Sequence, residues 1–122
     1  MAVERGKAAM TRGFATLPGP PYYGVVFSSQ RNGLDEAGYA EAAQRMQELA
    51  ALQPGFLGME SARDAAGFGI TTSYWADEAS ILAWREQAEH AAVRARGRSR
   101  WYGHYELRVA KVERAYGKKG DQ

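Results

Sequence analysis

Two side chains in the second half of the chain, Trp84 and His90, offer the clearest chemistry in this sequence. A histidine exchanges a proton near neutral pH or ligates a metal, and an indole can form the wall of a pocket for a flat ligand. The chain has two histidines and no cysteine, which excludes thiolate nucleophiles and cysteine-ligated zinc. His90 is therefore a candidate proton carrier or axial metal ligand, and the alternative is a structural histidine beside Glu86 and Glu89.

Both residues lie in a predicted helix that starts after Asp77 and continues to Gly97. Asp77 is a suitable N-cap, and small or apolar residues follow the helical period at Ile81, Trp84, Ala88, Ala91 or Ala92, and Ala95. Six residues of continuous helix turn through about 600°, so Trp84 and His90 are expected about 120° apart, on no common face. Trp84 then either packs in the core between helix and sheet or stacks on a ligand.

The first half of the chain predicts a strand followed by a helix. Residues 22–29 are rich in aromatic and β-branched types and precede a turn signal. The helix over residues 35–53 has Asp35 as a possible N-cap and ends before Pro54, which disfavours helical geometry in the preceding residue.

Three more strands are predicted around the helix that carries Trp84. Residues 56–63 and 68–75 are short segments whose spacing suits an antiparallel hairpin. Residues 101–116 alternate apolar and polar types, with a change of parity that predicts a bulge near Ala110.

The resulting order, β-α-β-β-α-β, is typical of the ferredoxin-like α+β fold, in which two helices cover one face of a four-stranded antiparallel sheet. We expect this domain over residues 22–116, an N-terminal tail over residues 1–21 and a C-terminal tail over residues 117–122. With 122 residues, of which 45% are hydrophobic and 25% charged, the chain fits one globular domain.

Charge and hydropathy point to no membrane or nucleic-acid partner. The formal net charge is only +2, which is a small excess rather than a basic surface. The first 21 residues lack the apolar segment of a signal peptide, and no run approaches the roughly 20 apolar residues of a membrane span. A cytoplasmic protein is therefore expected.

The sheet face away from the helices is expected to carry a mixture of aromatic and polar side chains. By strand parity we assign to it Phe56, Gly58, Glu60, Thr71, Ser73, Trp75, His104, Glu106 and Arg108. Such a surface suits a homodimer that pairs sheet on sheet, with charged pairs such as Glu60 and Arg108. The alternative is that Trp75 is partly exposed at a strand end.

RNA binding is another known use of such a face, and its third-strand signature allows a comparison. Residues 66–73 share Phe68 and the glycines, but Ala66 replaces the basic residue, and Ile70 and Ser73 replace two aromatics. Four arginines lie at the end of the predicted helix that carries Trp84 and just beyond it, namely Arg94, Arg96, Arg98 and Arg100. They are typical of a solvated turn that complements the helix dipole. We expect no nucleic-acid partner.

Several stretches together resemble the antibiotic biosynthesis monooxygenase (ABM) domain family. They are PGFLGMES at residues 54–61, ITTSYW at residues 70–75, Ile81 to Trp84 with His90, and Gly97-Arg98 with Trp101-Tyr102. The resemblance spans roughly residues 22–116. It implies a ferredoxin-like domain that pairs through its sheet into a dimeric α/β barrel, in agreement with the fold and the open face predicted from the pattern.

The resemblance implies more than one possible activity, because members of this family differ. Some oxidise aromatic polyketides with dioxygen and without metal or flavin, others degrade heme, and some act on quinones or signalling-related metabolites. The heme-degrading members combine a tryptophan and a later histidine of the second helix with an asparagine of the first strand. Trp84 and His90 match the first two by type, at closer spacing, whereas the first strand carries Ser28 and Ser29 and no asparagine.

The cofactor-independent oxygenases of the family use a second-helix tryptophan, which makes Trp84 a catalytic candidate here. They also use pocket tyrosines, and the candidates in this chain are Tyr39, Tyr74 and Tyr105. We hypothesise that His90 accepts a proton from an electron-rich aromatic substrate, and that Arg85 or an arginine of the later run stabilises the resulting anion.

This hypothesis predicts a monooxygenase for a small aromatic or quinone-like substrate, with no metal and no cofactor. Heme is the alternative cofactor, with His90 as its ligand. The alternative function is a non-catalytic homodimer that binds a small ligand or serves in a stress response.

Overall fold

The four predicted strands form one antiparallel sheet in the computed structural model, which describes residues 13–118. In chain order the elements are β1 (Tyr22–Arg31), α2 (Glu36–Ala51), β2 (Phe56–Arg63), β3 (Phe68–Trp75), α3 (Glu78–Glu86), α4 (Ala88–Arg96), the π-helical turn η1 (Gly97–Trp101) and β4 (Tyr102–Val112). Within the sheet the strand order is β2-β3-β1-β4. The ferredoxin-like arrangement is confirmed, and β2 and β3 have the predicted bounds.

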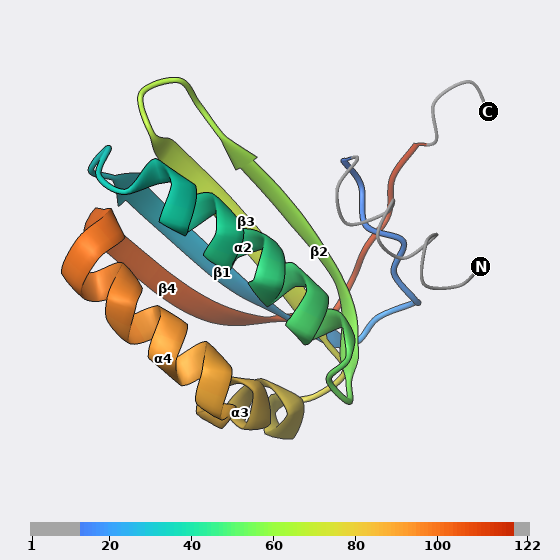
Figure 1. The fold of residues 1–122 in the computed structure, drawn as a ribbon. Coiled ribbons are helices and arrows are strands. Elements are labelled where there is room, and N and C mark those ends of the chain that lie inside the picture. Colours follow the sequence, from blue (N-terminus) through green and yellow to red (C-terminus); the bar gives the residue numbers. More distant parts are fainter. Residues whose placement is uncertain (1–12, 119–122) are drawn as a thin grey trace.

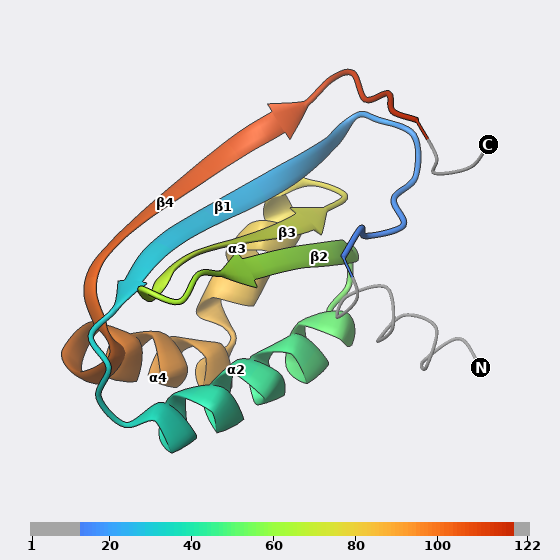
Figure 2. The same cartoon turned by 90° about the horizontal axis from the view of Figure 1, so that it is seen from above.

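All helices lie on one face of the sheet (Figure 1), and the two layers are seen from above in Figure 2. In Figure 1, α2 crosses in front of β1 and β3, while α4 lies beside α2 and next to β4, with α3 at its lower end. The core between the layers contains Leu49, Ala50, Met59, Trp75 and Trp84. The buried side chains of α2 recur on one face of that helix, because only this face contacts the sheet.

Both predicted helix N-caps are confirmed. Asp35 Oδ1 accepts a hydrogen bond from the Gly38 backbone N–H at 3.2 Å, and Asp77 Oδ1 accepts one from Ser80 N–H at 2.8 Å. These bonds satisfy backbone donors that have no partner inside a helix. The hydrogen bonds from Ser80 also lower the pKa of the Asp77 carboxyl. Hence α2 and α3 begin where the sequence predicts.

The prediction that Trp75 lies on the open face is wrong. Glu60 pairs with Thr72 across β2 and β3, so the alternate residues Ser73 and Trp75 face the helices. Trp75 is fully buried, and its Nε1–H donates to Ser73 Oγ at 2.9 Å. Three other residues assigned to the open face also lie on the helix side, namely Phe56, Thr71 and Ser73.

The open face keeps the remaining predicted residues, which are Gly58, Glu60, His104, Glu106 and Arg108. The three from β4 are exposed, and His104 Nε2 lies 2.9 Å from Glu106 Oε2. This surface is therefore polar at β4.

The bulge in the last strand lies at its start, so the prediction of a bulge near Ala110 is wrong. Arg31 of β1 pairs with Tyr102, whereas the residue before it pairs with His104. Gly103 is thus the extra residue between two successive pairs. A bulge bends the strand locally, and this one lies where β4 leaves the π-helical turn.

Part of the N-terminal segment contacts the open face at β2. The Ala15 backbone N–H donates to Glu60 Oε2 at 3.1 Å. A Cβ added to Gly58 would lie 3.0 Å from Ala15 Cβ and 3.1 Å from Leu17 Cδ2, so the segment passes close over this glycine. Residues 1–12 and 119–122 of the two predicted tails lie outside the described residues. Between residues 13 and 118, no helix is long and apolar enough to cross a membrane.

Candidate functional site

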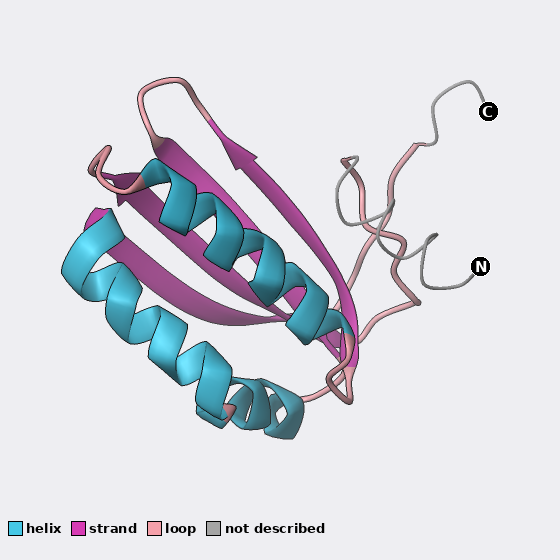
Figure 3. Cartoon of the chain, viewed as in Figure 1, coloured by secondary structure: helices cyan, strands magenta, loops and turns pink. Residues whose placement is uncertain are grey.

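The helix predicted from Asp77 to Gly97 is interrupted at Gln87, so the prediction of one continuous helix is wrong. Gln87 has an extended backbone, with φ −60° and ψ 129°, and it ends α3 and begins α4. Its side-chain Oε1 accepts a hydrogen bond from His90 N–H at 2.8 Å, as an N-cap does. Figure 3 shows the joint between the two helices as a short loop-coloured segment.

This interruption brings Trp84 and His90 together. Their rings are stacked, with centroids 4.0 Å apart and planes inclined by 13°. The Trp75 and Trp84 rings are also stacked, with centroids 6.0 Å apart and planes inclined by 28°. The expected separation of about 120° assumed a continuous helix. Because a new helix begins after Gln87, His90 is not rotated away from Trp84.

His90 has a defined proton position because of its backbone contact. Its Nδ1 lies 2.8 Å from the carbonyl oxygen of Trp84, which can only accept, so Nδ1 carries the proton and Nε2 keeps its lone pair. Burial lowers the pKa of His90, and the nearby charge of Arg94 acts in the same direction, against the hydrogen bond to Trp84. At neutral pH His90 is therefore an uncharged base.

A second group of aromatic rings covers the helix-facing side of β1 and β4. Tyr102 is at its centre, with ring centroids 5.9 Å from Tyr39, 6.3 Å from Tyr105 and 5.3 Å from Phe27. Burial is the main cause that raises the pKa of Tyr102, followed by the charge of Tyr39. Tyr39 and Tyr105 are predicted site residues, so the structure brings them together around Tyr102. The sequence interpretation assigned Tyr102 no role of its own.

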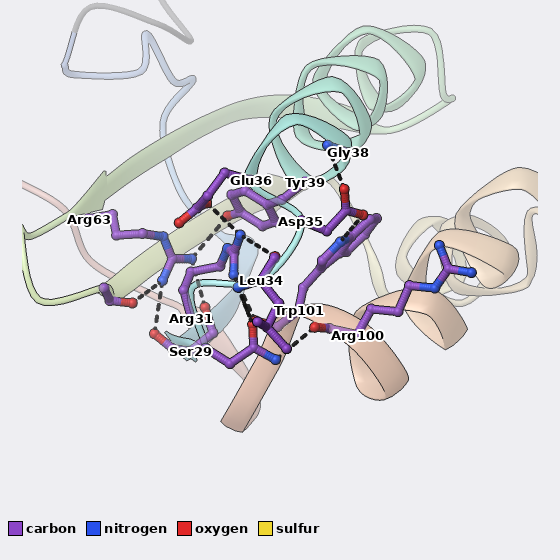
Figure 4. Close-up of polar contacts among 12 residues, drawn as sticks. Ser29, Arg31, Leu34, Asp35, Glu36, Gly38, Tyr39, Arg63, Arg100 and Trp101 are labelled. Atoms are coloured by element: carbon purple, nitrogen blue, oxygen red, sulfur yellow. Dashed lines mark hydrogen bonds and ion pairs between the residues drawn. The ribbon is translucent and has the colours of Figure 1, made fainter.

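Two arginines surround the Tyr39 ring (Figure 4). Arg31 Cζ lies 4.1 Å from the ring centroid, which is a cation–π contact. Arg63 Nη2 donates to the Tyr39 hydroxyl at 3.1 Å and to Ser29 Oγ at 2.8 Å. The phenol of Tyr39 is thus fixed from one side by a charged donor.

Arg31 also ties the loop after β1 to the π-helical turn. Its Nη1 donates to the Trp101 carbonyl at 2.9 Å, and its Nη2 lies 2.6 Å from Glu36 Oε1. Asp35 Oδ2 accepts from Trp101 Nε1 at 3.0 Å in the same region, seen beside Arg31 in Figure 4. These bonds position the start of α2 and hence Tyr39. Sequence patterning missed this network because an arginine at a strand end is ordinarily solvated.

Tyr74 and Arg85 are the two remaining predicted residues. Tyr74 is on the opposite face of the sheet, where its hydroxyl donates to Glu60 Oε1 at 3.0 Å. Burial, with Glu60 as the next cause, raises the pKa of Tyr74 to about 12. Arg85 is exposed near the end of α3, and its carbonyl accepts from Arg94 Nη2 at 3.1 Å.

The predicted site residues therefore fall into three places. Trp84, His90 and Arg85 lie at the joint of α3 and α4, Tyr39 and Tyr105 lie in the aromatic group, and Tyr74 lies across the sheet.

A cavity of about 390 Å³ lies between α2 and α4. Its lining is Asp35, Gly38, Glu41, Ala42, Arg45, Glu89, Val93, Arg96, Arg100 and Trp101. Arg45 and Glu89 bridge the two helices, with N–O distances of 2.6 and 3.0 Å. Because charges of both signs line this space and none of the six predicted residues does, it is a poor match to an apolar substrate. Among the described residues no group of three histidine or acidic side chains could hold a metal ion.

Comparison with known proteins identifies the family. The model of the antibiotic biosynthesis monooxygenase family matches residues 24–96, which is more than half of the chain. The chain belongs to this family. The resemblance seen in the sequence is thus confirmed. Within curated proteins, "Uncharacterized protein YqjZ" of Bacillus subtilis is 56% identical over 97 residues, covering 80% of this chain and 84% of YqjZ.

Solved structures show the same fold at low sequence identity. SnoaB, a cofactor-independent oxygenase from Streptomyces nogalater, superposes with a TM-score of 0.69 at 15% identity, over 81% of this chain and all of SnoaB. Rv0793 from Mycobacterium tuberculosis has a TM-score of 0.67 at 11% identity, over 78% of this chain and 99% of that one. At these identities the similarity shows the ABM fold alone.

Proposed function

We propose that this ABM-family protein is a monooxygenase that oxidises a small aromatic or quinone-like substrate with dioxygen, without metal or flavin. The observation that carries the proposal is the uncharged His90, whose ring is stacked on Trp84 and whose Nε2 keeps a lone pair that can accept a proton. Membership of the family and the fold shared with a cofactor-independent oxygenase support it.

The proposed chemistry starts with a proton transfer. His90 Nε2 accepts a proton from an acidic C–H or O–H of the substrate, and the resulting delocalised carbanion or phenolate is oxidised by dioxygen. For an anthrone, a ring CH₂ becomes a carbonyl, one oxygen atom enters the product and the other leaves as water. The four electrons come from the substrate, so no external reductant is needed. The indole of Trp84 supports the imidazole that takes the proton.

Substrate binding in this proposal involves the aromatic group as well. Tyr39 and Tyr105 lie on the helix side of the sheet, and Arg63 orients the Tyr39 hydroxyl. Arg85 is the proposed counter-charge for the substrate anion. Tyr74 is not part of this binding surface, because it lies on the other face of the sheet.

The proposal includes a homodimer in the cytoplasm. The polar open face of β4, with Glu106 and Arg108, is the surface for sheet-on-sheet pairing. Light scattering at micromolar concentration should give twice the chain mass of 13.4 kDa. A monomeric mass would contradict the pairing without touching the proposed chemistry.

Heme binding is a second candidate because of the hydrogen bond to His90 Nδ1. A metal-ligating histidine commonly donates its other ring N–H to a backbone carbonyl, which is the arrangement that His90 has with Trp84. Added hemin would then give a Soret shift that is lost in His90→Ala and kept in His104→Ala. An unchanged spectrum removes this candidate.

Dioxygen uptake tests the monooxygenase proposal. Wild type is compared with His90→Gln and His104→Gln on a panel of hydroquinones and anthrones, in the presence of a chelator. We expect uptake above the autoxidation rate, reduced by about 10²-fold or more in His90→Gln and unchanged in His104→Gln, which is exposed on the far face. Inactivity on the whole panel with tight binding of one compound would favour the non-catalytic ligand-binding protein.

A further inference from the structure

Three arginines that form no ion pair with any residue between 13 and 118 gather where α3, α4 and the π-helical turn meet. They are Arg85, Arg94 and Arg98. Arg94 Nη2 donates to the Arg85 carbonyl at 3.1 Å, and Arg98 follows Arg94 by one helical turn. The ion pairs found among residues 13–118 involve other side chains, so the charge of Arg94 is not neutralised there and is opposed by those of Arg85 and Arg98.

Arg94 has an unusual environment within this cluster. Its Nε is buried and has no hydrogen-bond acceptor among the described residues. A buried donor without a partner is costly, and native proteins ordinarily provide water, an ion or a ligand for it. Burial and the charges of Arg85 and Arg98 lower the pKa of Arg94. One anion placed beside Arg94 would relieve both the repulsion and the missing acceptor.

An apolar strip lies on the helix-facing side of β4, next to this cluster. Leu107 and Val109 are each 49% exposed, although their partners in β1, Phe27 and Val25, face the helix layer. Tyr105, 38% exposed, continues the strip and lies near Arg94. The strip thus offers an apolar surface that ends at a positive cluster.

We propose that Arg94, with Arg98, binds a carboxylate carried by the aromatic substrate, while the ring system lies along Tyr105, Leu107 and Val109. Arg85 remains the counter-charge for the anion formed during oxidation. This inference rests on the proposed function and narrows its substrate class to aromatic carboxylates. Guanidinium groups suit it because they donate paired, charge-assisted hydrogen bonds to a carboxylate. The substrate anion is then a permanent group that orients the molecule, distinct from the anion formed during oxidation.

The test uses two ligands of nearly equal shape, 2-naphthoate and the neutral 2-naphthamide, titrated into the full chain by calorimetry. We expect wild type to bind 2-naphthoate roughly tenfold or more tightly than 2-naphthamide, since a charge-assisted pair is strong. Arg94→Gln and Arg98→Gln should lose this preference, and Arg94→Lys should retain part of it. Arg100→Gln is the matched control, because it removes the same charge from the side that lines the cavity between α2 and α4.

Equal affinities of wild type for the two ligands, or no binding of either, would overturn the carboxylate site. An equal loss in Arg100→Gln would also overturn it, since only general charge would then matter. If circular dichroism shows that Arg94→Gln is unfolded, Arg98→Gln decides the outcome. Because neither ligand is oxidised in this assay, dioxygen uptake on the anthrone panel tests the proposed function separately: uptake without a carboxylate preference refutes only the binding site.

Discussion

Replacing Gln87 with alanine should separate Trp84 from His90. The Gln87 side chain caps α4 through the His90 N–H at 2.8 Å, and its extended backbone creates the joint between the helices. Alanine removes the cap and favours helical geometry, so α3 and α4 can join. In a joined helix His90 would turn about 120° away from Trp84, which ends the ring stacking at 4.0 Å.

The expected loss of stability is about 1 kcal/mol, the typical value for a lost N-cap. For a chain of 122 residues such a loss lowers the melting temperature by roughly 4 °C. Gln44→Ala is the control, since Gln44 is exposed within α2 and its side chain donates to Glu48 Oε2 at 3.4 Å. It should change the free energy of unfolding by less than about 0.5 kcal/mol.

The pKa of His90 gives the structural readout, followed by NMR in both variants. In wild type burial holds this pKa below 6.5, and in Gln87→Ala it should rise toward that value. Between 6.5 and the lower pKa of the folded protein, His90 binds a proton in the unfolded chain but not in the folded chain. The free energy of unfolding of wild type therefore falls as pH falls through this window. The pH dependence should be weaker in Gln87→Ala. An unchanged pKa of His90 in a folded Gln87→Ala would refute the reasoning that the cap positions the imidazole.

Two further outcomes are expected, one for backbone geometry and one for the open face. Gly55→Ala should destabilise the fold by about 2–4 kcal/mol in chemical denaturation, because a Cβ at φ +82° would lie 2.0 Å from Ser80 Oγ. Gly33→Ala has the same φ and no described atom within 4 Å of the added Cβ, so it should cost only about 1 kcal/mol. Equal losses in the two variants would contradict the role of packing against Ser80. Tyr74 should remain protonated at pH 11 by NMR of labelled tyrosine, since its pKa is about 12. Glu60→Gln should lower that pKa while burial keeps it above 10, and no change would exclude a contribution from the carboxylate.

Local signals in the sequence account for most of the fold. Asp35 and Asp77 are both helix N-caps, as predicted. The bounds of β2 and β3 match the prediction to the residue, because strand-forming residues and the turn residues between them mark the same boundaries. The prediction of the sheet face on which Trp75 lies is wrong. The alternation within a strand shows which residues share a face, but it does not show which of the two faces is covered by the helices.

The site was less predictable, because its geometry depends on one residue with no breaker character. Gln87 is a good helix former with neither proline nor glycine beside it, so nothing in the sequence indicates that the helix stops there. The interruption decides that His90 meets Trp84. Likewise, the contacts of Arg31 and Arg63 with Tyr39 depend on how β1, β2 and α2 come together, which no local pattern encodes.

Isotope labelling under ¹⁸O₂ tests the proposed oxygenase most directly. An anthrone is converted in the presence of chelator, and the quinone product is examined by mass spectrometry for wild type, His90→Gln and His104→Gln. The account predicts one ¹⁸O atom per product molecule, formed by wild type and His104→Gln well above the autoxidation rate and slowed about 10²-fold or more in His90→Gln. Product without label, or equal rates in wild type and His90→Gln, would contradict it.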